Sequence, residues 1–240
     1  MQLPLGIRWD QGADLAGFVP GSNAEAVTAV EAAAAGDPVP VFLHGPSGGG
    51  KSHLLQGACR RAGAVGAASA YLPLSQLGEH GPELLDGLEG VRLLAVDDID
   101  CIAGRRQWEH ALFHLYNRGH ERGTAMVMAA RQPPAALGLG LPDLASRLGW
   151  GLVIRVRTPD DEVRLTVLRT KARESGLDLP EKAARYLLTR CSRDLVHLLR
   201  LLDRLDAASL AQGRRLTVPF IREVLGEPGA TRGGHTKPPS

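Results

Sequence analysis

The chain has 240 residues, 44% of them hydrophobic and 22% charged, which is enough for one large folded domain or for a main domain with a smaller one behind it. Its 28 basic and 26 acidic side chains leave a net charge of +2, so charge alone does not indicate a nucleic-acid-binding protein. The three cysteines lie far apart and form no C-x-x-C pair, which argues against a disulfide framework and a thiolate metal site.

Short apolar runs that end in turn residues predict the strands of a buried sheet. In chain order they are Val41–His44, Ala70–Leu74, Arg92–Val96, Ala125–Ala130 and Leu152–Val156. Helical patterns occupy two of the intervals, at Lys51–Arg61 and Arg105–Arg122. Because strands and helices alternate, we predict an α/β domain over residues 9–157, with a parallel sheet and helices on both faces.

The pattern becomes entirely helical after Pro159. Four helices are predicted, at Pro159–Ser175, Pro180–Cys191, Arg193–Ala211 and Thr217–Leu225. They indicate a small all-helical domain over residues 158–226. Residues 227–240 are rich in Gly and Pro without periodicity, and we predict a disordered tail there.

A phosphate-binding motif follows the first predicted strand. The run Gly45-Pro46-Ser47-Gly48-Gly49-Gly50-Lys51-Ser52 fits G-x-x-x-x-G-K-[ST] at every fixed position, between a strand and a helix as the motif requires. The glycines let backbone N–H groups surround phosphates, Lys51 can neutralise their oxygens, and Ser52 can ligate Mg²⁺. The sequence therefore predicts a site for ADP or ATP with Mg²⁺, formed by these eight residues and the adjoining His53.

Two carboxylates end the third predicted strand. Asp97 and Asp98 follow the apolar run Leu93–Val96, and parallel topology places such residues beside the phosphate loop. Asp97 can hold Mg²⁺, partly through water, and Asp98 can orient an attacking water. The apolar run alone is a weak signal, but the loop upstream gives it meaning.

These motifs, in this order, resemble the AAA+ ATPases, and within them the DnaA branch and the Hda family of regulatory inactivators. The resemblance rests on four stretches: Asp97-Asp98 with the following residues to Gly104, Trp108-Glu109, Leu115-Tyr116-Asn117-Arg118, and Leu139–Leu148 with Trp150-Gly151. It extends from about residue 2 to residue 225, and the last stretch is the most specific. It implies a P-loop AAA+ domain followed by a helical lid.

The resemblance also assigns roles to two arginines. Arg147 matches the arginine finger, which reaches the nucleotide of a neighbouring subunit and stabilises charge on the transferred phosphoryl group. Arg193 matches the lid arginine that contacts the chain's own nucleotide. One position departs from the family: Arg131 and Gln132 follow the fourth predicted strand where Asp and then Arg are usual.

The first eight residues resemble the peptide with which such proteins bind the sliding clamp of DNA polymerase. Gln2 offers an amide donor and acceptor, and Leu3, Leu5 and Ile7 can fill an apolar pocket from an extended terminus. Gly6 and Ile7 replace more usual residues. The resemblance thus implies two protein partners, the clamp and the initiator DnaA.

The sequence is compatible with three functions. The first is a clamp-tethered regulator, with weak or no ATPase activity of its own, that stimulates ATP hydrolysis by DnaA and so prevents re-initiation. The second is a DnaA-like or helicase-loader-like ATPase acting on DNA, and the third a self-contained ring motor. Residues 63–90 contain four acids and no Lys or Arg, which disfavours DNA binding there. We therefore expect a regulator that meets DNA only indirectly and can form homo-oligomers.

The sequence has no secretory signal pattern and no apolar run of about 18 residues. We accordingly predict a cytoplasmic protein without a membrane partner.

Overall fold

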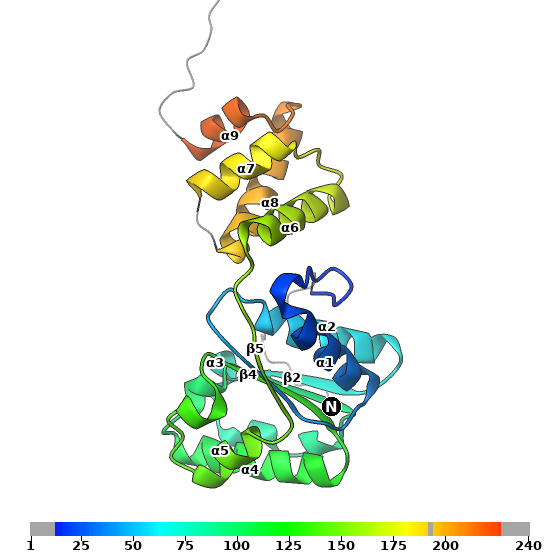
Figure 1. Cartoon of the computed structure of the whole chain (residues 1–240), viewed down its shortest axis with the longest axis vertical. Helices are drawn as coiled ribbons and strands as arrows, with labels where there is room; N and C mark the ends of the chain where they lie inside the picture. Colours follow the sequence, from blue (N-terminus) through cyan, green and yellow to red (C-terminus); the bar gives the residue numbers. More distant parts are fainter. Residues whose placement is uncertain (1–12, 192–193, 227–240) are drawn as a thin grey trace, which may run out of the picture. The chain divides into compact units, whose positions relative to one another are not determined.

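The computed structural model describes residues 13–191 and 194–226, which form two compact units that divide after Pro159. Figure 1 shows the elements of both units. The first unit has a hydrophobic core on each face of its sheet, and the second has a core of its own. No helix of the described residues is both long and apolar enough to cross a membrane.

The first unit is built on a five-stranded sheet. Its strands are β1 (Val41–His44), β2 (Ser69–Pro73), β3 (Leu93–Asp97), β4 (Ala125–Ala130) and β5 (Leu152–Arg155). They lie in the order β2-β3-β4-β1-β5 with every pairing parallel. The predicted parallel α/β architecture is confirmed.

Helices cover both faces of this sheet (Figure 1). Helices α1 (Ala24–Ala35) and α2 (Lys51–Ala64) pack on one face, and α4 (Arg106–Glu121) and α5 (Pro142–Leu148) on the other. Alternate strand residues enter the two cores: Val41 and Leu43 join the first and Phe42 the second. Because both faces of β3 and β4 and most of β1 are buried, these strands are apolar runs rather than alternating patterns, whereas most of the edge strand β5 is exposed.

Short elements complete the first unit. They are η1 (Gly21–Asn23), α3 (Leu74–Leu77), η2 (Pro82–Leu85), η3 (Leu88–Gly90), η4 (Ile99–Ile102) and η5 (Pro134–Ala136). The sequence pattern predicts Leu74 at the end of a strand, but this residue begins α3. No pattern in the sequence predicts α1 or α5. Helix α1 is mostly alanine, which has high helix propensity but gives little contrast between a buried and an exposed face.

The second unit is a bundle of four helices, as predicted. They are α6 (Asp161–Glu174), α7 (Glu181–Arg190), α8 (Leu195–Gln212) and α9 (Val218–Leu225). Capping side chains set three of the starts: Asp160, Asp194 and Thr217 each accept a hydrogen bond from a backbone N–H of the first turn. The interior is mostly leucine, closed by Phe220 and Ile221 of α9.

One buried carboxylate joins α4 to the loop before α5. Glu109 is only 1% exposed. Its Oε1 accepts hydrogen bonds from the backbone N–H groups of Gly104 (2.7 Å) and Gly140 (3.1 Å), and its Oε2 from Leu141 N–H (2.8 Å). Three donors satisfy the buried charge, so Glu109 fixes the loop that leads into α5.

We expect Glu109→Ala to lower the free energy of unfolding by about 3 kcal/mol, since three buried donors lose their acceptor. Thermal unfolding followed by circular dichroism should show a midpoint roughly 10 °C lower. The matched control is Glu121→Ala, an exposed glutamate at the other end of α4, which should change the midpoint little. Equal effects of the two substitutions would contradict the anchoring role.

Candidate functional site

The loop between β1 and α2 has a backbone that only glycine accommodates at two positions. Gly45 has a φ of +148°, and a Cβ there would lie 2.1 Å from the backbone oxygen of Val156. Gly50 has a φ of +93°, and its Cβ would lie 2.7 Å from the Phe18 ring. The loop therefore packs closely on the end of β5 and on Phe18. This close packing explains the glycines of the phosphate-binding motif.

Lys51 begins α2 and folds back over the loop. Its ammonium donates hydrogen bonds to the carbonyl oxygens of Gly45 (2.7 Å) and Pro46 (2.9 Å). Partial burial lowers the Lys51 pKa, an effect opposed by Asp97, Asp98 and other nearby acids. No side chain of the described residues caps the N-terminus of α2, so its first N–H groups remain open to an anion.

The buried carboxylate of Asp97, which is only 1% exposed, lies at the end of β3. It accepts hydrogen bonds from the Tyr71 hydroxyl (2.8 Å) and from the backbone N–H of Asp98 (3.0 Å). Burial raises the Asp97 pKa, and hydrogen bonds from Ser52 and Tyr71 counteract this rise. The structure thus brings Asp97 and Ser52, the two predicted Mg²⁺ ligands, into contact.

Asp98 has a strained backbone: with a φ of +56° it is the one non-glycine among the described residues in the left-handed region. Such a conformation costs about 1 kcal/mol and often occurs at functional sites. The Ser75 hydroxyl of α3 donates a hydrogen bond to the Asp98 carboxylate and fixes its direction.

Arg131, at the end of β4, is tied to a neighbouring acid. Its backbone N–H donates to Asp100 Oδ1 (3.0 Å), and its Nε lies 3.4 Å from Asp100 Oδ2. The basic residue that replaces the usual aspartate is therefore paired within the carboxylate cluster at this end of the sheet.

The segment before α1, whose sequence predicts only a polar connector, lies against the phosphate loop. The rings of Phe18 and His53 lie 5.7 Å apart, and His53 Nε2 is 3.1 Å from the Asp14 carbonyl oxygen. Asn23 is buried, with its amide bonded to the backbone N–H and C=O of Arg157 (2.8 and 2.9 Å). Phe18, Asn23, Tyr71 and Ser75 were all missed, because nothing in their local pattern reveals a contact so distant in sequence.

Arg147 lies on the last turn of α5, far from the phosphate loop of its own chain. It precedes β5, whose first residue Leu152 pairs with Val41 at the start of β1, whereas the loop follows the end of β1. Its guanidinium stacks on Trp150, with Cζ 3.9 Å from the ring centroid. The loop therefore lies at the carboxyl ends of the parallel strands, and Arg147 lies at their amino ends.

Known families match both units. Residues 161–225 match the family described as the Hda lid domain, and residues 81–155 match the bacterial DnaA ATPase domain. Among solved structures, domain III of the Thermotoga maritima replication initiation protein DnaA has a TM-score of 0.76 at 22% identity. The match covers 92% of this chain and 98% of that one.

The chain is an AAA+ protein related to DnaA and Hda. DnaA from Aquifex aeolicus, solved with AMPPCP bound, also resembles this AAA+ protein, with a TM-score of 0.69 at 23% identity over 85% of this chain and 67% of that one. The Thermotoga maritima RuvB branch migration motor gives 0.65 at 16% identity, over 90% and 72%. At these identities the structural neighbours establish the fold.

Several predicted site residues of this AAA+ protein lie outside the described residues. They are Arg193 of the lid and the clamp-binding set Gln2, Leu3, Leu5 and Ile7. Their assignments remain predictions. Among the described members, Gly45 through His53 with Asp97 and Asp98 gather at the carboxyl ends of the strands, whereas Arg147 lies at their amino ends.

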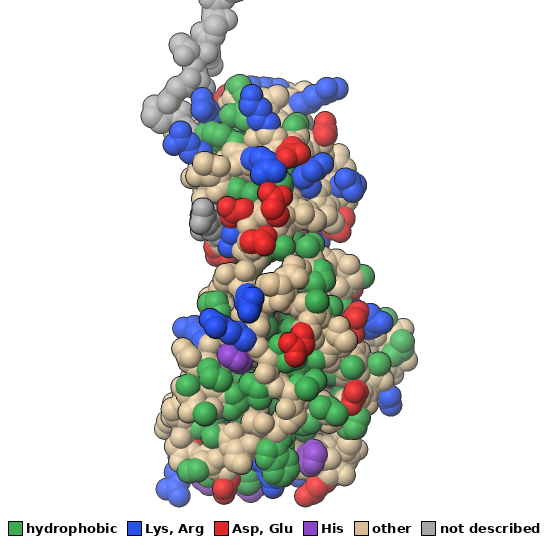
Figure 2. All heavy atoms as spheres, viewed as in Figure 1, with side chains coloured by type: hydrophobic (Ala, Val, Ile, Leu, Met, Phe, Trp, Pro, Cys, Tyr) green, Lys and Arg blue, Asp and Glu red, His purple; other side chains and the backbone are tan. Residues whose placement is uncertain are grey.

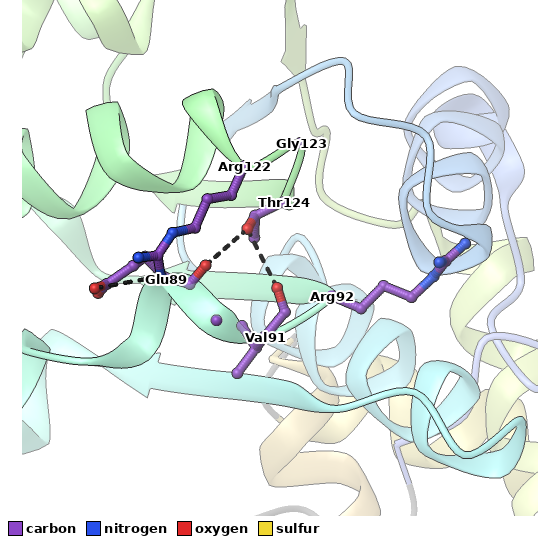
Figure 3. Close-up of a pocket in the computed structure, with 7 residues that line it drawn as sticks. Glu89, Val91, Arg92, Arg122, Gly123 and Thr124 are labelled. Carbon is purple, nitrogen blue, oxygen red and sulfur yellow. Dashed lines mark hydrogen bonds and ion pairs between the residues drawn. The ribbon is translucent and has the colours of Figure 1, made fainter.

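A separate pocket of about 300 Å³ lies at the opposite edge of the AAA+ sheet (Figure 3). Glu89 forms ion pairs there with Arg122 and Arg118, each at 3.5 Å. The Thr124 hydroxyl lies 3.2 Å from the carbonyl oxygens of Glu89 and Val91, and Figure 3 marks these contacts with dashed lines. These contacts hold η3 against the end of α4.

Proposed function

We propose that this AAA+ protein binds ADP or ATP with Mg²⁺ in the loop Gly45–Ser52. The support is a backbone that excludes side chains at Gly45 and Gly50, the cation of Lys51 and the open N-terminus of α2. Ser52 and Asp97 would hold the Mg²⁺, which neutralises charge on the phosphate oxygens when bound. The AMPPCP in related DnaA structures supports the same assignment.

The proposal predicts a pH dependence through Asp97. Burial raises its pKa, so acidification should protonate it and weaken Mg²⁺-dependent ADP binding at a higher pH than for an exposed aspartate. In Tyr71→Phe a bond that stabilises the carboxylate is lost, and the pKa should rise further. The pH at which binding is half lost should therefore move upward.

This shift can be measured by titrating a fluorescent ADP analogue with and without Mg²⁺ across the acidic range. The matched control is Tyr186→Phe in the lid, which also removes one tyrosine hydroxyl and should leave the midpoint unchanged. A midpoint that stays or moves downward in Tyr71→Phe would show that Asp97 is not the titrating ligand.

For the whole protein we propose a regulator of replication initiation. Tethered to the sliding clamp by Gln2–Ile7, it would place Arg147 at the nucleotide of DnaA and stimulate hydrolysis there, which prevents re-initiation. Its own ATPase activity would be weak or lacking. Arg193 would contact the bound nucleotide, which would thereby fix the position of the lid. The support is the Hda lid match and the position of Arg147, away from its own phosphate loop.

A DnaA-like or helicase-loader-like ATPase acting on DNA is the alternative. It is favoured by the similarity to a DnaA structure bound to AMPPCP and single-stranded DNA, with a TM-score of 0.71. Against it, the segment from β2 to η3 exposes Glu79, Glu83 and Asp86 and contains no Lys or Arg. On the face of the helical lid shown in Figure 2, basic and acidic side chains are interspersed rather than gathered in a basic stripe.

The test is ATP hydrolysis by DnaA, followed with and without this protein and with and without clamps loaded on DNA. Stimulation that requires the loaded clamp supports the regulator. Confirmed nucleotide binding without any stimulation of DnaA would favour the DNA-acting alternative.

A further inference from the structure

Within the described residues, the Arg147 side chain is held by its contact with Trp150. The guanidinium carbon lies 3.9 Å from the centre of the indole. Within residues 13–191 and 194–226, no carboxylate pairs with Arg147 and no side-chain hydrogen bond engages it. Arg131 and Arg122, by contrast, each lie against a carboxylate.

This arrangement leaves the donors of Arg147 available. A guanidinium carries its five N–H groups in its own plane, so an aromatic ring against its face blocks none of them. An ion pair would occupy one or two of these donors and would have to break before another anion could bind. Stacking thus restricts a flexible side chain while its edge remains free for a phosphate.

Trp150, on which the guanidinium stacks, is itself held in place from two sides. Gly151 has a φ of +81°, and a Cβ there would lie 2.3 Å from the Pro40 carbonyl oxygen, which also accepts a hydrogen bond from Leu152 N–H (2.9 Å). Behind it, His120 meets the Trp150 ring edge to face at 6.0 Å. The tryptophan is therefore positioned by the backbone at β1 and by α4.

Yet Trp150 is not a core residue, because 44% of it is exposed. The neighbouring Tyr116 is buried and stacks on His120 at 6.2 Å, and its hydroxyl has no hydrogen-bond partner among the described residues. Burial raises the Tyr116 pKa, and the charge of Arg147 partly offsets that rise. The guanidinium is thus bordered by aromatic groups rather than by acids.

We propose that Trp150 is a positioning residue, which holds the guanidinium of Arg147 by its face so that its N–H edge can meet phosphate oxygens on a neighbouring molecule. This role rests on the proposed function of Arg147. In this role Trp150 raises the rate of stimulated hydrolysis and does not change the affinity between the two proteins.

The test compares Trp150→Leu, which keeps an apolar side chain without a π face, with Trp150→Phe, which retains one. In full-length protein, Trp150→Leu should lower the maximal stimulated rate of DnaA hydrolysis about 10-fold, with little change in the half-saturating concentration. Trp150→Phe should restore most of that rate. Leu152→Ala, an equally exposed apolar neighbour, controls for lost surface and should leave the maximal rate unchanged.

A second measurement does not depend on DnaA. The Nε–H resonance of Arg147, assigned with Arg147→Lys, should carry an upfield ring-current shift that disappears in Trp150→Leu. If wild-type protein fails to stimulate DnaA, the proposed function fails, and the role of Trp150 fails with it. If wild-type protein stimulates, an undiminished rate in Trp150→Leu, or no recovery in Trp150→Phe, overturns this inference alone.

Discussion

Arg147→Ala is expected to abolish stimulation of DnaA ATP hydrolysis while leaving nucleotide binding by this protein intact. An arginine supplied in trans is worth about 10³–10⁵ in rate, because it stabilises charge that develops on the transferred phosphoryl group. Arg147 lies across the sheet from the loop Gly45–Ser52, so its loss should not disturb that site. Single-turnover hydrolysis of ATP preloaded on DnaA measures the first effect, and a fluorescent ADP titration the second.

Two further variants show whether this loss is specific to Arg147. Arg61→Ala removes an exposed arginine of the same domain, paired with Glu31 at 3.0 Å, and should stimulate normally. Arg147→Lys keeps the positive charge but loses the planar fork, and should recover only a small part of the rate. Normal stimulation by Arg147→Ala would falsify the assignment of this residue as the finger.

Lys51→Ala should weaken ADP and ATP binding about 100-fold, a loss of roughly 3 kcal/mol for a charge-assisted contact with phosphate. Two hydrogen bonds hold the ammonium over the loop, so the side chain is already directed to the place where phosphate would lie. Isothermal titration with ADP and Mg²⁺ measures the change. Any part of the stimulation of DnaA that depends on nucleotide bound to this protein should then be lost, even though Arg147 is unchanged.

The matched control is Lys182→Ala, an exposed lysine of the lid, which should bind ADP as wild-type protein does. Circular dichroism must show that Lys51→Ala folds, because the carbonyl oxygens of Gly45 and Pro46 lose their donor. Unchanged affinity in a folded Lys51→Ala protein would exclude the loop as the nucleotide site.

The phosphate loop and the acidic strand end could be predicted from the sequence because their constraints are local. A fixed spacing of glycines, Lys51 and Ser52 encodes one backbone shape, and the apolar run before Asp97 encodes one strand. Parallel topology then brings the two together without further information. The contact of Ser52 with Asp97 follows from that logic.

The supporting contacts could not be predicted, since each joins residues distant in the chain. Glutamate is usually exposed on a helix, so the sequence gives no sign that Glu109 is buried. The loop near Gly140 packs against it and makes it a buried acceptor. Tyr71 and Asn23 likewise gain their roles from partners 26 and 134 residues away. The strained backbone of Asp98 gives no pattern in the sequence at all.

The parallel sheet gives the molecule two unlike ends. The phosphate loop follows the carboxyl end of β1, whereas Arg147 and Trp150 precede the amino end of β5. A two-fold dimer joins the same patch on both partners, so it would have to span both edges to engage the two sites reciprocally. A head-to-tail contact needs only one edge from each molecule. A row of such subunits would have a direction, with an unused arginine at one end of the row and an unused nucleotide site at the other. A regulator that donates only its arginine could join such a row at one end only.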